Sequence, residues 1–169
     1  MNQTQQFSHP DLVYSMELPA DWNVDIGGIS NGLVMAAAPE PWSMGFHPNI
    51  TMTHARLGPD DAGGTEAAMA AQRAAERSFV DTFEDYRLLH LDYETFGTTG
   101  DDAAQVPGVM RVAYYTNPEG VPLMMHQWAA RHAGVEVSMT VTFAAADLPD
   151  WSRGSWSLAS LLRWKEAAP

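Results

Sequence analysis

The sequence predicts an α+β domain with an antiparallel sheet of about six to seven strands, and three observations lead to this prediction. Residues 65–85 contain neither Gly nor Pro and are rich in residues that favour helices. Several other stretches alternate apolar and polar residues with a period of two, which is typical of strands with one buried face. Short turns separate these stretches, so neighbouring strands are expected to pair as hairpins.

Three strands are expected before the long helix, at residues 12–18, 32–38 and 49–57. The helix follows over residues 65–85, with Thr65 as its N-cap. Small and aromatic residues recur along it at three- and four-residue spacing, which predicts one face packed on the sheet. These residues are Ala68, Ala71, Ala75, Phe79 and Phe83.

Four more strands are expected after the helix, at residues 86–96, 109–116, 122–132 and 135–143. In the first of these, Leu89, Leu91 and Tyr93 are expected to face inward. Ala133-Gly134 is expected to form the last hairpin turn. A short C-terminal helix over residues 155–166 completes the predicted order and is expected to pack on the sheet.

The length and composition favour one soluble domain over residues 1–169. A chain of 169 residues with 46% hydrophobic and 18% charged residues can bury a full core without metal or disulfide support. It contains no cysteine, which excludes thiol nucleophiles, Cys-ligated zinc and iron–sulfur clusters.

The charge balance argues against a nucleic-acid partner. Nine basic residues stand against 21 acidic ones, for a formal net charge of −12, and the arginines are scattered. No basic and apolar leader segment precedes residue 7, and no apolar stretch reaches the roughly 20 residues of a membrane-spanning helix. A cytoplasmic location without membrane insertion is therefore expected, although a leader trimmed from the chain would leave the same sequence.

One short motif points to catalysis. Residues 28–32 match the G-x-S-x-G pattern, which would make Ser30 an acyl-transfer nucleophile. Such a serine sits between a strand and a helix, whereas an apolar strand is expected to follow this one. A glycine-rich turn is therefore the favoured interpretation. The spacing of the six histidines predicts no metal site, and no cofactor motif is present.

Apolar residues in unusual places provide the candidate binding residues. Residues 39–48 form a proline-bracketed connection that carries Trp42, Met44 and Phe46. Such side chains either tuck under their own loop or meet a partner. In the strand 122–132, Met124 and Trp128 share one face, while Leu123, Met125 and Gln127 share the other. The first face is expected either to contact the core or to line a groove.

Two further segments resemble a known family. Residues 9–11 and 14–22, with Pro19 and Trp22 at the corner, resemble the opening of PsbP-like domains. Residues 45–52 resemble a strand of the actinobacterial LpqN-like lipoproteins and of the DcrB-like bacterial proteins. The resemblance implies a curved antiparallel sheet with helices on its faces, and no shared catalytic residues. It also implies accessory, envelope-associated or protein-binding roles, one branch acting as chaperones for hydrophobic segments of secreted effectors.

These observations lead to one leading hypothesis, a non-enzymatic protein- or peptide-binding module that uses Trp42, Met44, Phe46, Met124 and Trp128. The chain is expected to be a monomer or a homodimer, since an exposed edge strand can pair with a second copy. Two alternatives stay open. One is a carrier of a small apolar or lipid-like ligand, with the Met-rich strand lining a cavity. The other is a hydrolase that uses Ser30.

Overall fold

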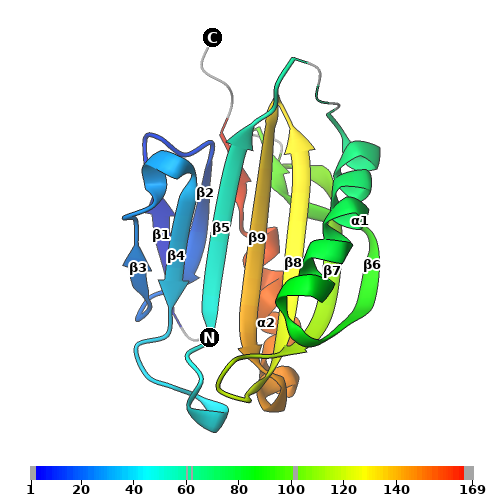
Figure 1. The fold of residues 1–169 in the computed structure, drawn as a ribbon. Helices are drawn as coiled ribbons and strands as arrows, with labels where there is room; N and C mark the ends of the chain where they lie inside the picture. Colours follow the sequence, from blue (N-terminus) through cyan, green and yellow to red (C-terminus); the bar gives the residue numbers. More distant parts are fainter. Residues whose placement is uncertain (1–2, 60, 62, 101–102, 166–169) are drawn as a thin grey trace.

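The computed structural model describes residues 3–59, 61, 63–100 and 103–165, and they form one ten-stranded sheet with two α-helices (Figure 1). The strand order is β1-β2-β10-β6-β7-β8-β9-β5-β4-β3. Only the β10–β6 pair is parallel. The strands are β1 (Thr4–Ser8), β2 (Tyr14–Pro19), β3 (Asn23–Asp25), β4 (Leu33–Ala37), β5 (Asn49–Arg56), β6 (Glu84–Thr99), β7 (Ala104–Thr116), β8 (Pro122–His132), β9 (Val135–Ala144) and β10 (Arg163–Trp164).

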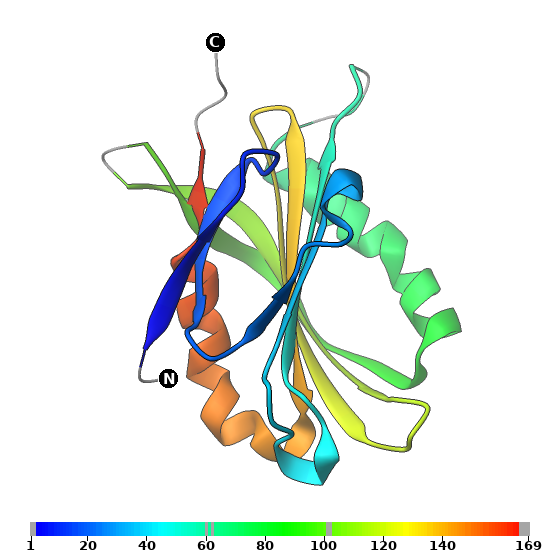
Figure 2. The same cartoon turned by 90° about the vertical axis from the view of Figure 1, so that its left-hand side faces the viewer.

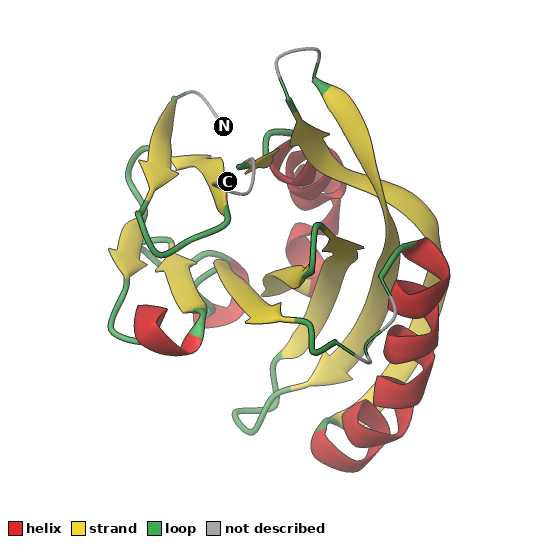
Figure 3. Cartoon of the chain, turned by 90° about the horizontal axis from the view of Figure 1, so that it is seen from above, coloured by secondary structure: helices red, strands yellow, loops and turns green. Residues whose placement is uncertain are grey.

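The two helices, α1 (Thr65–Thr82) and α2 (Leu148–Ser160), lie on opposite faces of the sheet (Figure 2). Seen from above, the sheet curls around α2, while α1 lies outside it against β6, β7 and β8 (Figure 3). The inner face and α2 enclose the main core. Its fully buried members include Tyr14, Met16, Ile50, Met52, Met139, Phe143 and Leu158. Because strand side chains alternate between faces, the other residues of the same strands face α1 or solvent.

The fold class and the long helix agree with the sequence prediction, but the strand count was wrong. The sheet has ten strands rather than six or seven, so α1 follows the fifth strand and not the third. β1 was missed because it is polar and lies at a sheet edge, with alternate residues exposed. β3 and β10 have three and two residues, too few to show a periodicity; β3 pairs with the next strand, β4, and β10 pairs with β2 and β6, which lie far along the chain.

The inward face predicted for residues 86–96 was also wrong at two positions. The β6–β7 register shifts between Leu88 and His90, so Leu89 has no partner opposite it and is 57% exposed. Tyr93 lies on the same face of β6 as Leu91 but is 48% exposed, and its hydroxyl donates to Glu66 of α1 at 2.9 Å. Leu91 alone of the three packs against the residues buried beneath α1.

The boundaries of both helices differ from the predicted ones. α1 begins at Thr65 but ends at Thr82, because Phe83 is extended and Asp85 has a positive φ of 54°. Its N-cap is Gly64 rather than Thr65. α2 begins at Leu148, with a proline in its first turn, where the absent N–H costs nothing. It ends at Ser160, because the next residues pair in the sheet. Glu166, the last residue of the predicted helix, lies outside the described residues.

The predicted turn at Ala133-Gly134 is confirmed. His132 pairs with Val135, which leaves a two-residue loop between β8 and β9. Ala133 and Gly134 have φ values of 49° and 75°, the conformation that a tight hairpin requires. This turn fixes the register of β8 and β9, whose side chains form part of the floor of the candidate site.

Candidate binding site

The connection between β4 and β5, which we call the 39–48 loop, lies at one end of the sheet and is held at both ends and in its middle. Ala38 N–H donates to Pro48 O at 2.9 Å, which closes the base of the loop. Trp42 N–H donates to Phe46 O at 2.8 Å, which forms a tight inner turn. The hydroxyl of Ser43 donates to Asp147, just before α2. The loop is therefore an ordered part of the fold.

Met44 occupies a strained position at the tip of this inner turn. Its φ of 59° lies in the left-handed region, which residues other than glycine rarely adopt. Its side chain is 59% exposed and so gains little from packing. Strained residues of this kind persist where the surrounding structure determines them, and they are often found at binding sites. The strained backbone at Met44 thus holds an apolar side chain in solvent.

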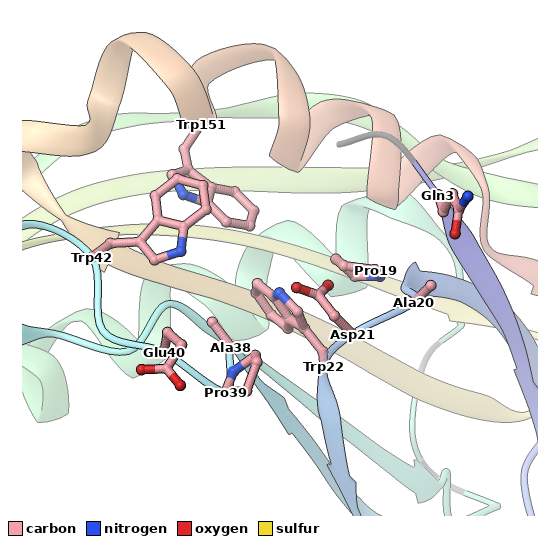
Figure 4. Close-up of a pocket in the computed structure, with 10 residues that line it drawn as sticks. All are labelled: Gln3, Pro19, Ala20, Asp21, Trp22, Ala38, Pro39, Glu40, Trp42 and Trp151. Carbon is pink, nitrogen blue, oxygen red and sulfur yellow. The ribbon is translucent and has the colours of Figure 1, made fainter.

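Trp42 leaves the loop on the side of α2. Its indole ring lies 5.6 Å from that of Trp151, which in turn lies 5.6 Å from Trp22. These rings border a cavity of about 500 Å³, which we call the tryptophan cavity (Figure 4). Trp42 is 43% exposed, whereas Trp22 and Trp151 are buried. Pro19 to Trp22, the corner that carries the family resemblance, forms one wall of this cavity.

Phe46 leaves the loop on the opposite side, over the outer face of the sheet. It borders two adjoining cavities of about 760 and 510 Å³ that also share Asn49 and Asn117. We call their union the outer groove. Met44 lines the smaller cavity. The walls of the larger one are the aromatic residues Phe46, Phe79, Phe83 and Tyr115, and its floor is formed by Asn49, Thr51, Leu123, Met125, Gln127, Thr140 and Thr142.

The floor of the outer groove contains an unsatisfied polar group. Gln127 Nε2 donates to Thr140 Oγ1 at 3.1 Å, which orients the amide. Gln127 Oε1 is buried and has no hydrogen-bond partner among the described residues. A buried acceptor without a donor costs about 1–3 kcal/mol. On the groove wall, Tyr115 lies 4.4 Å from Phe83, ring to ring, and burial raises the pKa of its phenol.

Met124 and Trp128 are separated from the other three predicted residues. Both lie on the inner face of β8, where Trp128 is fully buried and Met124 is 5% exposed. Trp128 packs edge-on against Trp156 of α2 at 5.8 Å. Of the two roles weighed for this face, contact with the core is the one that the structure shows. The groove belongs to the opposite face, where Leu123, Met125 and Gln127 lie, as the alternation along the strand indicated.

The G-x-S-x-G motif has a structural explanation. Ser30 is exposed in the 3-10 turn Ile29–Asn31, and no histidine or carboxylate among the described residues makes a hydrogen bond with its hydroxyl. Gly32 has a φ of 75°, and a Cβ there would lie 2.1 Å from His54 O. Glycine is therefore required at position 32 to let the turn approach β5.

A buried histidine and serine link the sheet to α2. His126 Nδ1 lies 2.8 Å from Ser155 Oγ, which donates to Trp151 O at 2.9 Å. Burial lowers the pKa of His126 to about 4, so the ring is neutral at pH 7. Because Ser155 is completely buried, this pair packs the core rather than meeting a substrate. Within the described parts of the chain, no three His, Asp or Glu side chains gather as metal ligands.

Comparison with known proteins gives the fold family but no function. No family model and no curated protein sequence matches the chain. The solution structure of the cyanobacterial PsbP of Synechocystis sp. PCC 6803 superposes with a TM-score of 0.68 at 12% identity, over 97% of this chain and 94% of that one. LpqN of Mycobacterium tuberculosis, described as involved in cell envelope biogenesis, gives 0.62 at 11%, over 98% and 93%.

A third structure, a Pseudomonas aeruginosa protein of unknown function, gives a TM-score of 0.54 at 13% identity and covers 99% of both chains. The chain thus has a PsbP-like fold with LpqN-like structural relatives, as the sequence resemblance predicted. None of these three descriptions names a catalysed reaction. Neither helix in the described residues has the length and apolar character needed to cross a bilayer.

Proposed function

We propose that the protein is a non-enzymatic peptide-binding module and that the outer groove is its binding surface. The observation that carries this proposal is the unpartnered Gln127 Oε1 on the groove floor, between aromatic walls. When the partly exposed amide of Gln127 rotates into the groove, a bound peptide segment would supply a backbone N–H to this acceptor and place apolar side chains against Phe46 and Phe83. Aromatic and methionine side chains are enriched in the contact regions of protein interfaces.

The groove favours a particular kind of peptide. Its lining includes the carboxylates of Glu84 and Glu119 and contains no Lys or Arg. Together with the net charge of −12, this disfavours acidic segments. We therefore expect an apolar segment that is neutral or basic and at least partly extended, so that its amides are free to meet Asn49, Gln127 and the threonines.

The same acceptor argues against the alternative of a carrier for a small hydrocarbon ligand in this groove. A hydrocarbon would cover Gln127 Oε1 without providing a donor, which would keep the cost of its burial. The Met-rich strand on which that alternative rested turns Met124 and Trp128 into the packed core and presents Leu123 and Met125, beside Gln127, to the outer groove. The hydrolase alternative rested on Ser30, whose motif glycine packs against β5.

Selection of a random 12-residue peptide library on the immobilised protein tests the proposal. Enriched peptides should carry aromatic or aliphatic residues and should bind in solution by calorimetry. Phe46→Ala should weaken this binding about tenfold, and Gln127→Met, which keeps the size but removes the acceptor, should weaken it by a similar factor.

Leu89→Ala provides the control, because Leu89 is an apolar, exposed side chain that lies outside both cavities. It should leave the affinity unchanged. Equal binding by wild type, Phe46→Ala and Gln127→Met would contradict the proposal, as would failure to enrich any peptide family.

The cytoplasmic location expected from the sequence is a separate proposal, which localisation of the tagged chain would test.

A further inference from the structure

The tryptophan cavity combines aromatic rings with carboxylates and lies apart from the outer groove, across the 39–48 loop. Figure 4 shows its ten lining residues, among which are Trp22, Trp42 and Trp151. Two acids, Asp21 and Glu40, also line it, and none of the ten residues is basic. The cavity therefore pairs the electron-rich faces of indoles with negative charge.

The rings form a corner rather than a stack. Trp151 is tilted by 49° from Trp22 and by 47° from Trp42, with 5.6 Å between ring centroids in each pair. Trp22 and Trp151 are 6% and 2% exposed, so their positions are fixed by packing. Trp42 forms the outer wall of the cavity, and its backbone is held by the hydrogen bond to Phe46 O within the 39–48 loop. A group in this corner would lie within reach of more than one ring.

Both carboxylates are available to a ligand. Asp21 and Glu40 are exposed, and neither forms an ion pair or a hydrogen bond with another of the described residues. Arg153 lines the neighbouring cavity of about 600 Å³ together with Asp150, on the other side of Trp42 and Trp151. No cation of the protein therefore neutralises the tryptophan cavity from within its own lining.

A buried polar group independently points to a ligand. The indole N–H of Trp151 is inaccessible to solvent and has no acceptor among the described residues. Buried tryptophan N–H groups usually find a partner. A molecule that displaces the half-exposed ring of Trp42 from Trp151 and offers an oxygen there would supply the missing acceptor.

We propose that the tryptophan cavity binds an organic cation, namely an alkylammonium group with a hydroxyl or carbonyl oxygen near the charged nitrogen. Indole faces attract such cations within about 6 Å of the ring centroid, most strongly when water is excluded. The two carboxylates add charge attraction, and the ligand oxygen accepts from Trp151. This inference does not depend on the outer groove, which lies elsewhere and shares none of these residues.

Titration of the full chain with choline tests the inference directly. The six tryptophans give six indole N–H signals in a proton–nitrogen NMR spectrum, and single Trp→Phe variants assign them. Choline should shift the signals of Trp22, Trp42 and Trp151 saturably and leave those of Trp128 and Trp164 in place. The uncharged analogue 3,3-dimethylbutan-1-ol, which has the same shape, should bind at least about tenfold more weakly.

N-acetyl-lysine methylamide forms a second arm of the titration. The free ε-ammonium group of this compound has no oxygen near it, so the compound should bind more weakly than choline. Binding at least as tightly as choline would overturn the proposed contact between a ligand oxygen and the indole N–H of Trp151. Equal affinity for choline and its uncharged analogue would overturn the inference, and so would the absence of any saturable shift of the three signals.

A double variant distinguishes the effect of the two cavity carboxylates from the effect of the net charge of the whole chain. Asp21→Asn with Glu40→Gln should weaken choline binding at least about fivefold, because both acids line the cavity. Asp11→Asn with Asp81→Asn changes the net charge equally but affects residues that line none of the cavities described above, and it should leave the affinity within about twofold. Equal weakening by both double variants would show that only the overall charge acts, which would overturn the proposed site. All four residues are exposed, so folding should survive each change.

Discussion

The hydroxyl of Ser43 donates a hydrogen bond to a buried carboxylate oxygen of Asp147, 104 positions later in the chain. This contact joins the 39–48 loop to the start of α2. The other carboxylate oxygen of Asp147 is buried without a partner among the described residues. Ser43 is therefore the side chain that satisfies a buried acid, and it holds the loop that presents Met44.

We expect Ser43→Ala to cost about 1–3 kcal/mol of the free energy of unfolding, because the change leaves both oxygens of Asp147 unsatisfied. Urea denaturation at pH 7 measures this cost. Ser30→Ala removes an exposed hydroxyl of the same kind and should change stability by less than about 0.5 kcal/mol. Equal stability of the two variants would show that Ser43 does not support the loop.

Trp42 and Trp128 should respond in opposite ways to truncation. Trp128→Ala removes a completely buried ring and should cost about 3–5 kcal/mol, enough to unfold a large part of a marginally stable population. Trp42→Ala should cost only about 1 kcal/mol, because it loses one ring contact at a half-exposed position. Thermal unfolding followed by circular dichroism compares the two. A loss at Trp42 as large as that at Trp128 would place Trp42 in the core.

Gly32 and Gly45 provide a matched pair for the glycine motif, since their φ values are 75° and 74°. A Cβ at Gly45 meets nothing within 4 Å, so Gly45→Ala should cost only the strain of a left-handed alanine, about 1 kcal/mol. Gly32→Ala adds a clash with His54 O and should cost about 2–4 kcal/mol. Similar losses in chemical denaturation would mean that β5 shifts to make room.

Arg111 forms a buried ion pair under α1. Its side chain is fully buried, and Nη1 lies 3.0 Å from Glu76 Oε2, while the guanidinium lies 4.3 Å from the centre of the Phe79 ring. Glu76→Gln should cost about 2 kcal/mol, because it leaves a buried cation without its counter-charge. Adding Arg111→Met should recover part of this loss, since no unpaired charge then remains. A double variant less stable than Glu76→Gln alone would contradict this expectation.

The burial of His126 predicts a pH-dependent stability. Its pKa is about 4 in the folded chain and near 6.5 when unfolded, so between these values only the unfolded state binds the proton. Stability is therefore complete above about pH 6.5, falls as the pH is lowered towards 4, and loses at most about 3 kcal/mol. His126→Gln should show a shallower fall over this range in urea titrations. Parallel curves would show that carboxylates or His54, rather than His126, account for the loss.

Local patterns predicted the elements that carry their own periodicity. The alternation in β9 and the Gly-free run of α1 were sufficient for these two, and Ala133-Gly134 set the turn between β8 and β9. The strands β3 and β10 are too short to show an alternation, and β10 also depends on partners far along the chain. The bulge at Leu89 likewise results from pairing with β7. It exposes Leu89, which the regular alternation of the sequence predicted to be buried.

The candidate site was predicted only in part, for a related reason. The prolines around residues 39–48 and the aromatic content between them singled out Trp42, Met44 and Phe46. Phe83 and Tyr115 were assigned to a helix face and a strand, and nothing in the sequence placed them beside Phe46. The proximity of these three side chains depends on the curvature of the sheet and on the residue at which α1 ends. Trp151 joins Trp42 only because α2 lies on the inner face. Whether the five predicted residues bind a partner stays a prediction.

The position of β10 has a consequence for the order in which the chain can fold during synthesis. The hairpin of β1 and β2 emerges from the ribosome before the other described strands, but it joins β6 through Arg163 and Trp164, which emerge after all of them. Lys165 N–H then donates to Val13 O at 2.8 Å, and Trp164 Nε1 donates to Phe96 O at 2.8 Å. The β2 edge of this hairpin therefore stays unpaired until residues 163 and 164 have been synthesised.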